Sequence, residues 1–169
     1  MEIVEFGPLT AEQRRELDGE EEDPFDSGGI MLHYRPKNRH VGLRDDAGAL
    51  IASTGMVVVE VGVGVERFPV VGLGGVIVKA LHRGRGLGRE VVQAALARAN
   101  SLGPAYAILF CHRDRAGLYR KLGFAEIAAE VLVQQPGGYA RMPHQTMRRR
   151  LRQKVEWPAG AVVVHSLPF

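Results

Sequence analysis

The sequence contains a single cysteine and no long apolar run, and both absences limit what the chain can be. One cysteine, Cys111, allows no internal disulfide and no cysteine-rich metal site. No segment reaches the roughly 18 uninterrupted apolar residues that a membrane-spanning helix needs, and the first ten residues lack a basic segment followed by an apolar one. The six histidines show no close metal-ligand spacing. We therefore expect a cytoplasmic protein with no membrane span and no metal site.

The composition is that of a folded domain. The chain has 169 residues, of which 46% are hydrophobic and 24% charged, so a single domain over residues 1–169 with one sizeable core is expected. The net charge of +3 is uneven, with an acidic run at 18–26 and a basic run at 147–154. The basic run alone suggests nucleic-acid binding, but it has no interleaved aromatic residues and matches no nucleic-acid motif. A solvated face is the simpler interpretation, and nucleic acid is the less favoured partner.

Hydrophobic periodicity and breaker residues predict an α+β fold with a mixed, mostly antiparallel central sheet and flanking helices. Thr10 is a plausible N-cap for the first helix, and Asp114 for the last. Two long strands are expected to form a hairpin that turns near Glu66 and Arg67. The predicted strands are 2–6, a strand near 40, 50–65, 66–81, 105–110, 125–134, 145–153 and 161–169. The predicted helices are 11–17, 88–103 and 114–123, and loops are expected over 18–40 and 135–143.

A glycine-rich segment connects a strand to the helix at 88–103. Gly84, Gly86 and Gly88 alternate with Arg83 and Arg85. Free N–H groups at a helix start, together with the helix dipole, favour an anion such as a diphosphate. Neither the GxGxxG dinucleotide pattern nor the phosphate-loop pattern is present, so the segment could also be only a tight turn.

Two segments resemble signatures of one family. "VIVKALHRGRGLGREVV" at 76–92 is similar to the acyl-CoA-binding segment of the GNAT superfamily of N-acyltransferases. "ILFCHRDRAGLYRKLGF" at 108–124 resembles the second signature of that family, and the two occur in the family's order. The resemblance implies the GNAT fold, in which two central strands splay apart in a V. In this chain the two strands would be about 74–80 and 105–111.

The resemblance also implies a site for acetyl-CoA as co-substrate. Backbone groups of Val76, Ile77 and Val78 would pair with the pantetheine arm and donate, at a bulge, to the thioester carbonyl, as an oxyanion hole does. The pyrophosphate would be held by the glycine-rich segment, which consists of Arg83, Gly84, Arg85, Gly86, Leu87, Gly88 and Arg89.

Tyr119 matches the family's tyrosine that protonates the departing thiolate, a role suited to a phenol that stays protonated at neutral pH. The alternative is an aromatic ring packed beside Leu122 and Phe124. Relatives often have asparagine about five residues earlier, where this chain has Asp114. The side chain of Asp114 therefore carries no prediction about the CoA arm.

The general base is less well defined. Many relatives place a glutamate on the strand before the glycine-rich segment, but residues 70–79 contain no carboxylate. Glu66 is the predicted base, and Glu60 and His112 remain open. Cys111 lies in an apolar stretch and is expected to pack in the core, so direct transfer is favoured over an acyl-enzyme.

The resulting expectation is an acetyl-CoA-dependent N-acetyltransferase that transfers acetyl directly to a primary amine, most readily of a small molecule. The acceptor site would be built from 18–40 and 134–145, and the acidic run could attract a cationic amine. A non-catalytic CoA-binding regulatory domain is the alternative, with a nucleic-acid-binding module behind it. Dimers are common among relatives, so a homodimer is compatible with this assignment.

Overall fold

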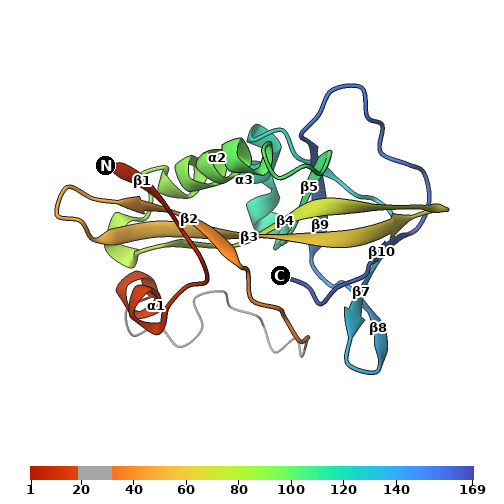
Figure 1. Ribbon diagram of the computed structural model, residues 1–169, viewed down its shortest axis with the longest axis horizontal. Helices are drawn as coiled ribbons and strands as arrows, with labels where there is room; N and C mark the ends of the chain where they lie inside the picture. Colours follow the sequence, from red (N-terminus) through yellow and green to blue (C-terminus); the bar gives the residue numbers. More distant parts are fainter. Residues whose placement is uncertain (19–31) are drawn as a thin grey trace.

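The computed structural model describes residues 1–18 and 32–169, and within them one branched sheet has helices on both faces (Figure 1). The strands are β1 (Glu2–Phe6), β2 (Arg39–Arg44), β3 (Leu50–Val63), β4 (Glu66–Val78), β5 (Tyr106–Cys111), β6 (Ala125–Glu126), β7 (Val131–Gln135), β8 (Gly138–Arg141), β9 (Gln145–Arg150) and β10 (Val162–Val164). The helices are α1 (Ala11–Asp18), α2 (Leu87–Ala99) and α3 (Ala116–Lys121), with short 3₁₀ turns η1 (Ala80–His82) and η2 (Arg113–Arg115).

The sheet is mixed and mostly antiparallel, which confirms the predicted class. Its described strands run in the order β6-β9-β5-β4-β3-β10-β7-β8, with β2 and β1 attached beside β3. Two neighbouring pairs are parallel, β4 with β5 and β10 with β7. All other pairs in the described part of the chain are antiparallel.

β3 organises the sheet because its length lets it pair with two strands along one edge. Its first half pairs with β2, and its last residues pair with β10. Along its other edge it pairs with β4, and the hairpin between them turns at Gly64 and Val65. The predicted hairpin is confirmed, with its turn slightly earlier than expected.

α2 covers one face of the sheet (Figure 1). Its predicted apolar stripe is buried, namely Val91, Val92, Ala95, Leu96 and Ala99. These side chains form one cluster with Val71 and Leu73 of β4 and with residues of α3. The three-to-four spacing of the stripe turns one continuous side of the helix towards the strands.

α1 lies on the opposite face (Figure 1). Its start is a capping box, because the backbone N–H of Gln13 donates to Thr10 Oγ1 at 3.1 Å and Thr10 N–H donates to Gln13 Oε1 at 3.0 Å. The predicted cap is confirmed. Leu17 of α1 packs with Leu50 and Ile77 beneath β3 and β4.

The C-terminal third differs from the prediction in its strand pairing. The expected loop at 135–143 contains β8, which pairs with β7, and the expected strand at 125–134 is broken between β6 and β7. The break arises because β6 joins β9 while β7 joins β8 and β10, at the other end of the sheet. Asp114 lies inside η2, and neither η2 nor α3 has a side-chain cap, so the predicted Asp114 cap is wrong.

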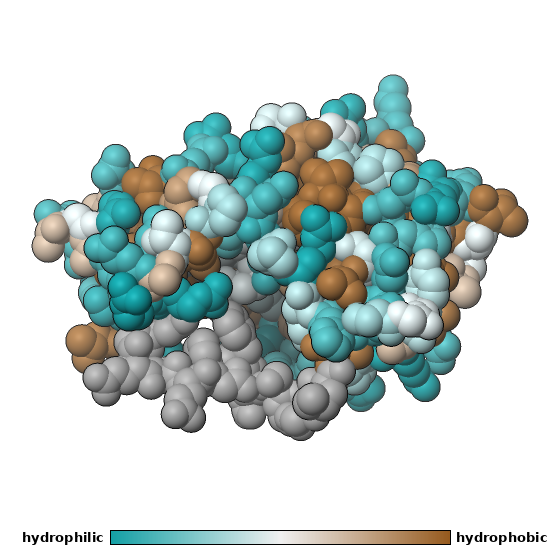
Figure 2. Space-filling model, turned by 60° about the horizontal axis from the view of Figure 1, so that its bottom comes forward, coloured by the Kyte–Doolittle hydropathy of each residue, from teal (hydrophilic) through white to brown (hydrophobic). Residues whose placement is uncertain are grey.

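The surface is mixed in character. On the face in Figure 2, hydrophobic side chains form small groups between hydrophilic ones. Within residues 1–18 and 32–169, no helix is long and apolar enough to cross a membrane.

Candidate active site

β4 and β5 separate at one end of the sheet. They pair only over Val71–Leu73 and Ala107–Leu109, whereas β4 continues to Val78 and β5 to Cys111. Beyond Leu73, the edge of β4 that faces away from β3 therefore pairs with no described strand. This is the predicted V-shaped splay, and it leaves backbone donors and acceptors open to an extended ligand.

A bulge in β4 lies where the splay begins. In the pairing with β3, Ser53 is opposite Ile77 but Gly55 is opposite Gly74, so β4 has one extra residue at this point. Gly75 adopts a φ of +64°, which a residue with a side chain rarely takes, and Thr54 Oγ1 donates to Gly74 O at 3.1 Å. The structure thus places the predicted residues Val76, Ile77 and Val78 directly after a bulge, on the splayed strand.

The glycine-rich segment connects β4 to α2 through η1. Gly84 and Gly86 have φ of +76° and +81°, and a Cβ on either would meet no atom within 4 Å. Gly86 is the N-cap of α2 and supplies no side-chain acceptor, so the first N–H groups of the helix have no described partner. Gly88 has ordinary backbone geometry, and a Cβ there would lie 3.7 Å from Val78 Cγ2. The first two glycines therefore shape the turn, while Gly88 lies close to β4.

Three arginines surround this helix start. Arg83 Nε donates to Val78 O at 3.1 Å, and Arg85 Nη1 lies 3.1 Å from His82 Nδ1. Arg89 is exposed on the first turn of α2. The helix dipole favours an anion at this helix start, and the guanidinium groups of Arg83, Arg85 and Arg89 belong to the same segment.

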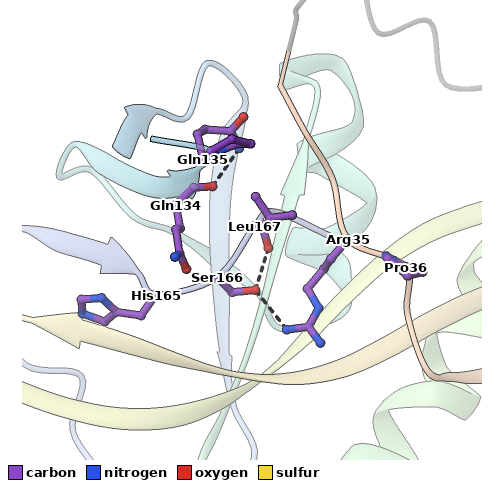
Figure 3. Close-up of a pocket in the computed structure, with 8 residues that line it drawn as sticks. Arg35, Pro36, Gln134, Gln135, His165, Ser166 and Leu167 are labelled. Atoms are coloured by element: carbon purple, nitrogen blue, oxygen red, sulfur yellow. Dashed lines mark hydrogen bonds between the residues drawn. The ribbon is translucent and has the colours of Figure 1, made fainter. Parts of the chain in front are cut away.

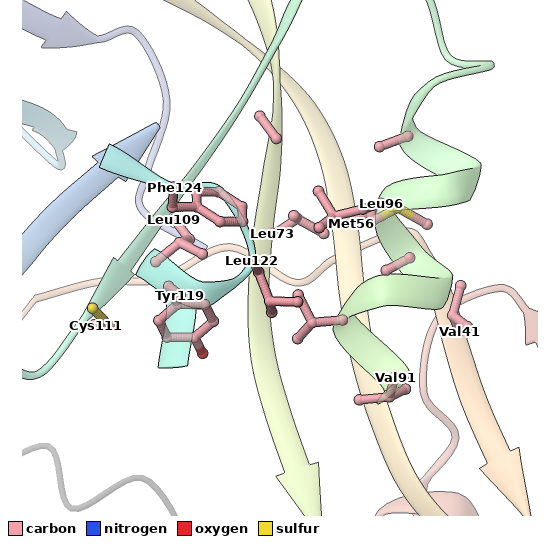
Figure 4. Close-up of a cluster of buried hydrophobic side chains, with 14 of the residues drawn as sticks. Val41, Met56, Leu73, Val91, Leu96, Leu109, Cys111, Tyr119, Leu122 and Phe124 are labelled. Atoms are coloured by element: carbon pink, nitrogen blue, oxygen red, sulfur yellow. The ribbon is translucent and has the colours of Figure 1, made fainter. Parts of the chain in front are cut away.

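Tyr119 lies on α3 and belongs to the apolar cluster beneath α2. Its ring is 8% exposed and contacts Phe124 edge-on, with centroids 6.0 Å apart. Its hydroxyl points away from the apolar cluster (Figure 4) and has no hydrogen-bond partner among the described residues. Burial, and secondarily the charge that the Cys111 thiolate would carry, raises the pKa of Tyr119 to about 12. The phenol thus keeps its proton throughout the neutral range.

Cys111 is a core residue, as expected. Its thiol is 8% exposed and lies 3.8 Å from Met147 Sδ. Burial, with Glu126 and Asp114 contributing, raises the pKa of Cys111 to about 11. A thiol that stays protonated is a poor nucleophile, so nothing in this environment supports a covalent intermediate.

The structure does not bring Glu66 to the splay. Glu66 is the first residue of β4, eight residues before Gly74, which corresponds to about 26 Å of extended strand. Glu60 is also distant and forms an ion pair with Arg67 near the hairpin turn. The prediction of Glu66 as the base is therefore wrong on position, because the hairpin turns at the opposite end of the strand.

His112 is the remaining candidate for the general base, and it directly follows β5 at the splay. Its backbone is extended, with φ −65° and ψ 149°. Phe110, two residues earlier, packs in the cluster that contains Val57 and Phe169. Its ring lies 4.6 Å from that of His144, whose pKa is lowered by burial and by His112. Sequence spacing could not reveal this pair, because it depends on the pairing of β5 with β9.

An open pocket of about 510 Å³ lies between β7 and the segment that follows β10 (Figure 3). It is lined by Arg35, Pro36, Gln134, Gln135, Pro136, His165, Ser166 and Leu167. The two segments expected to form the acceptor site, 18–40 and 134–145, thus both contribute to it. Arg35 Nη1 donates to Ser166 Oγ at 3.2 Å. The acidic run that was expected to attract an amine lies, apart from Asp18, outside the described residues.

Three of the four arginines of the basic run contact protein groups. Arg148 lies over the ring of Trp157 at 5.3 Å, Arg149 Nη1 donates to Leu122 O at 2.7 Å at the end of α3, and Arg150 pairs with Glu156. These three side chains have partners within the fold, whereas Arg152 of the same run is exposed.

Comparison with known families identifies this architecture. The family model of the GNAT acetyltransferase domain matches residues 24–127, more than half of the chain. The chain belongs to the GNAT acetyltransferases. It is accordingly an acyltransferase by family, and the splay, bulge and glycine-rich segment fall at the positions that the sequence resemblance predicted.

Solved GNAT structures share the fold. The GNAT family N-acetyltransferase YhbS from Escherichia coli, solved in complex with CoA, is 26% identical with a TM-score of 0.53 over 75% of this chain and 67% of its own. Escherichia coli ElaA is 21% identical with a TM-score of 0.56, covering 88% of this chain and 98% of its own. A phosphinothricin acetyltransferase from Sinorhizobium meliloti, in complex with acetyl-CoA, is 19% identical with a TM-score of 0.50 over 73% of this chain and 67% of its own. No curated protein sequence matches the chain.

Proposed function

We propose that this GNAT acetyltransferase transfers an acetyl group from acetyl-CoA directly to a primary amine of a small molecule. The observation that carries the proposal is the edge of β4 after its bulge, which pairs with no described strand, next to the start of α2, which no described side chain caps. An extended arm with amide groups suits the strand edge, and a diphosphate suits the helix start. The CoA complex of YhbS supports the same cofactor here.

In this arrangement the backbone of Val76, Ile77 and Val78 binds the pantetheine arm, and an N–H at the bulge donates to the thioester carbonyl. The N–H groups from Gly84 to Gly88 bind the pyrophosphate, with Arg83, Arg85 and Arg89 around it. A fixed donor to the developing oxyanion lowers the barrier by about 3 kcal/mol.

The reaction joins the amine nitrogen to the carbonyl carbon and breaks the carbon–sulfur bond. The attacking amine must first lose a proton, which His112 accepts directly or through a water. Tyr119 gives its proton to the departing thiolate and recovers one from solvent. The hydroxyl of Tyr119 has no other described hydrogen-bond partner, which favours this role over a purely structural one.

The acceptor would bind on the face opposite α2, in the pocket of Arg35 and Gln135. Phe169 extends this face towards the splay, since its ring lies 5.0 Å from Phe110 and fills the space above Gly72. The pocket is polar around Ser166 and apolar beside Leu167, as a small amphipathic amine would require.

The test is calorimetric titration of the full chain with acetyl-CoA, and with CoA and ATP as comparators. Saturable binding of acetyl-CoA and CoA with no comparable response to ATP is expected. A panel of small amines is then assayed for release of CoA thiol. Binding without release by any amine would favour the regulatory CoA-binding alternative, and no binding would refute the cofactor.

A matched pair of variants locates the cofactor. Gly86→Glu places a carboxylate at the start of α2, whereas Gly103→Glu places one beyond its C-terminal end. Both glycines have positive φ and open space around the missing Cβ, so both changes strain the backbone without a steric clash. Gly86→Glu is expected to abolish acetyl-CoA binding by repelling the pyrophosphate, and Gly103→Glu to preserve it. Equal affinity in the two folded variants would contradict the placement.

A further inference from the structure

The side chain of Lys37 lies along three glycines and ends at the β4 bulge. A Cβ on Gly55 would lie 2.8 Å from Lys37 Cβ and Cγ, one on Gly74 would lie 3.1 Å from Cε, and one on Gly75 would lie 3.3 Å from Nζ. The lysine stem thus lies against glycines of β3 and β4, and it shares this space with His40 Nε2, 2.8 Å from the Gly55 Cβ position, and with Phe169 O, 2.8 Å from the Gly74 Cβ position. The amine Nζ therefore lies beside Gly75, at the bulge where a backbone N–H would donate to the thioester carbonyl.

The Lys37 amine has unusual surroundings. Among the described residues, Nζ has no hydrogen-bond or ion-pair partner. Burial, and secondarily the charge of Arg14 on α1, lowers the pKa of Lys37 to about 8. On β2, the neighbouring titratable group is His40, whose pKa is lowered by burial and secondarily by the charge of Lys37. Roughly a tenth of the Lys37 amine is then neutral at pH 7, compared with well under a hundredth for an ordinary lysine.

The amine also lies on the side from which an acceptor would attack. Leu73 packs under α2, whereas Gly72 and Gly74 face the opposite side, against Phe169. A thioester bound in the plane of β4 exposes one face of its carbonyl to each side of the sheet. Lys37 lies on the side opposite α2, and the preceding residues Arg35 and Pro36 line the proposed acceptor pocket.

We propose that Lys37 is itself an acetyl acceptor, so that acetyl-CoA bound in the splay modifies its own enzyme at this residue. The neutral Nζ attacks the thioester carbonyl, a nitrogen–carbon bond forms and the carbon–sulfur bond breaks. One proton leaves the nitrogen and one reaches the CoA thiolate, giving Nε-acetyl-Lys37 and free CoA. The inference depends on the proposed acetyl-CoA site.

The modification changes the site in a defined way. An amide does not pass its acetyl group to another amine, so acetyl-Lys37 is an end state and not an intermediate. It removes a positive charge and adds bulk between the pocket and the bulge. Acetylated enzyme is therefore expected to turn over external amines more slowly.

The experiment incubates the purified full chain with acetyl-CoA in the absence of an amine and maps acetylated peptides by mass spectrometry over time. Lys121 and Lys154 are exposed and report acetylation in solution. Lys37 is expected to be acetylated at least tenfold faster than either, at a rate per molecule independent of protein concentration. Gly86→Glu is expected to lose the reaction, and Gly103→Glu to retain it.

Each other result overturns the proposal in a distinguishable way. Calorimetric binding of acetyl-CoA without preferential acetylation of Lys37 refutes self-acetylation and leaves the proposed function standing. Absence of binding refutes both. A rate per molecule that rises with protein concentration refutes transfer within one chain. A Lys37→Arg variant that acquires the same acetyl groups as wild type shows that the modified residue is another lysine.

Discussion

Replacing Tyr119 by phenylalanine tests the catalytic assignment with little structural disturbance. The ring is buried beside Phe124 and belongs to the cluster beneath α2, so phenylalanine preserves the packing. The hydroxyl makes no hydrogen bond to a described residue, so its removal breaks no hydrogen bond within residues 1–18 and 32–169. The free energy of unfolding is therefore expected to change by less than about 0.5 kcal/mol.

The expected loss of turnover follows from the environment of the phenol. With a pKa of about 12, Tyr119 is protonated whenever the thiolate leaves, yet it is a weaker acid than the thiol it forms. We therefore expect a general-acid contribution at the lower end of the usual range. Loss of the hydroxyl should lower kcat by about 100-fold, which corresponds to about 2.7 kcal/mol. Acetyl-CoA affinity should stay within about twofold, because the hydroxyl acts on the sulfur only as the bond breaks.

Tyr106→Phe is the matched control. Tyr106 is also buried, but its hydroxyl donates to Val155 O at 2.7 Å and lies in the other apolar cluster. Its removal should cost about 1 kcal/mol of stability and leave kcat unchanged. The assay is CoA thiol release with an accepted amine, combined with urea unfolding and acetyl-CoA titration of both variants. Wild-type kcat in a folded Tyr119→Phe enzyme would refute the general-acid role.

Two further predictions concern stability. Lys37→Met should raise the free energy of unfolding at pH 7, because the folded state holds the lysine proton less tightly than the unfolded chain. The increase is at most about 3 kcal/mol, and solvent screening of the lysine charge reduces it. The same linkage makes wild-type stability rise between pH 8 and 10.5, where the unfolded chain binds more protons, so the advantage of the variant should vanish above pH 10.5. Urea unfolding across this pH range measures both effects, and a variant no more stable than wild type at pH 7 would contradict the burial of the charge. Thr10→Ala should lower stability by about 1 kcal/mol through loss of the capping box, whereas Thr10→Ser should retain most of it; equal unfolding midpoints for all three proteins would show that the cap contributes nothing.

The sequence by itself determined the features that depend on a few neighbouring residues. The apolar stripe of α2, the capping box of Thr10 and the turn glycines at 84 and 86 were all readable, because helix periodicity, cap chemistry and positive φ are local properties. The family resemblance extended this to the splay, and it predicts that residues 83–89 bind the cofactor.

Only the tertiary structure decided which distant residues meet. Alternating apolar residues show that a strand has a buried face, but not which strand lies beside it. The base assigned to Glu66 therefore fell at the wrong end of β4, and the pairing of His112 with His144 was invisible. The placement of Lys37 over Gly55 and two glycines of β4 likewise joins three separate segments. Strand register is set by the packing of the whole sheet, and for that reason local sequence could not specify it.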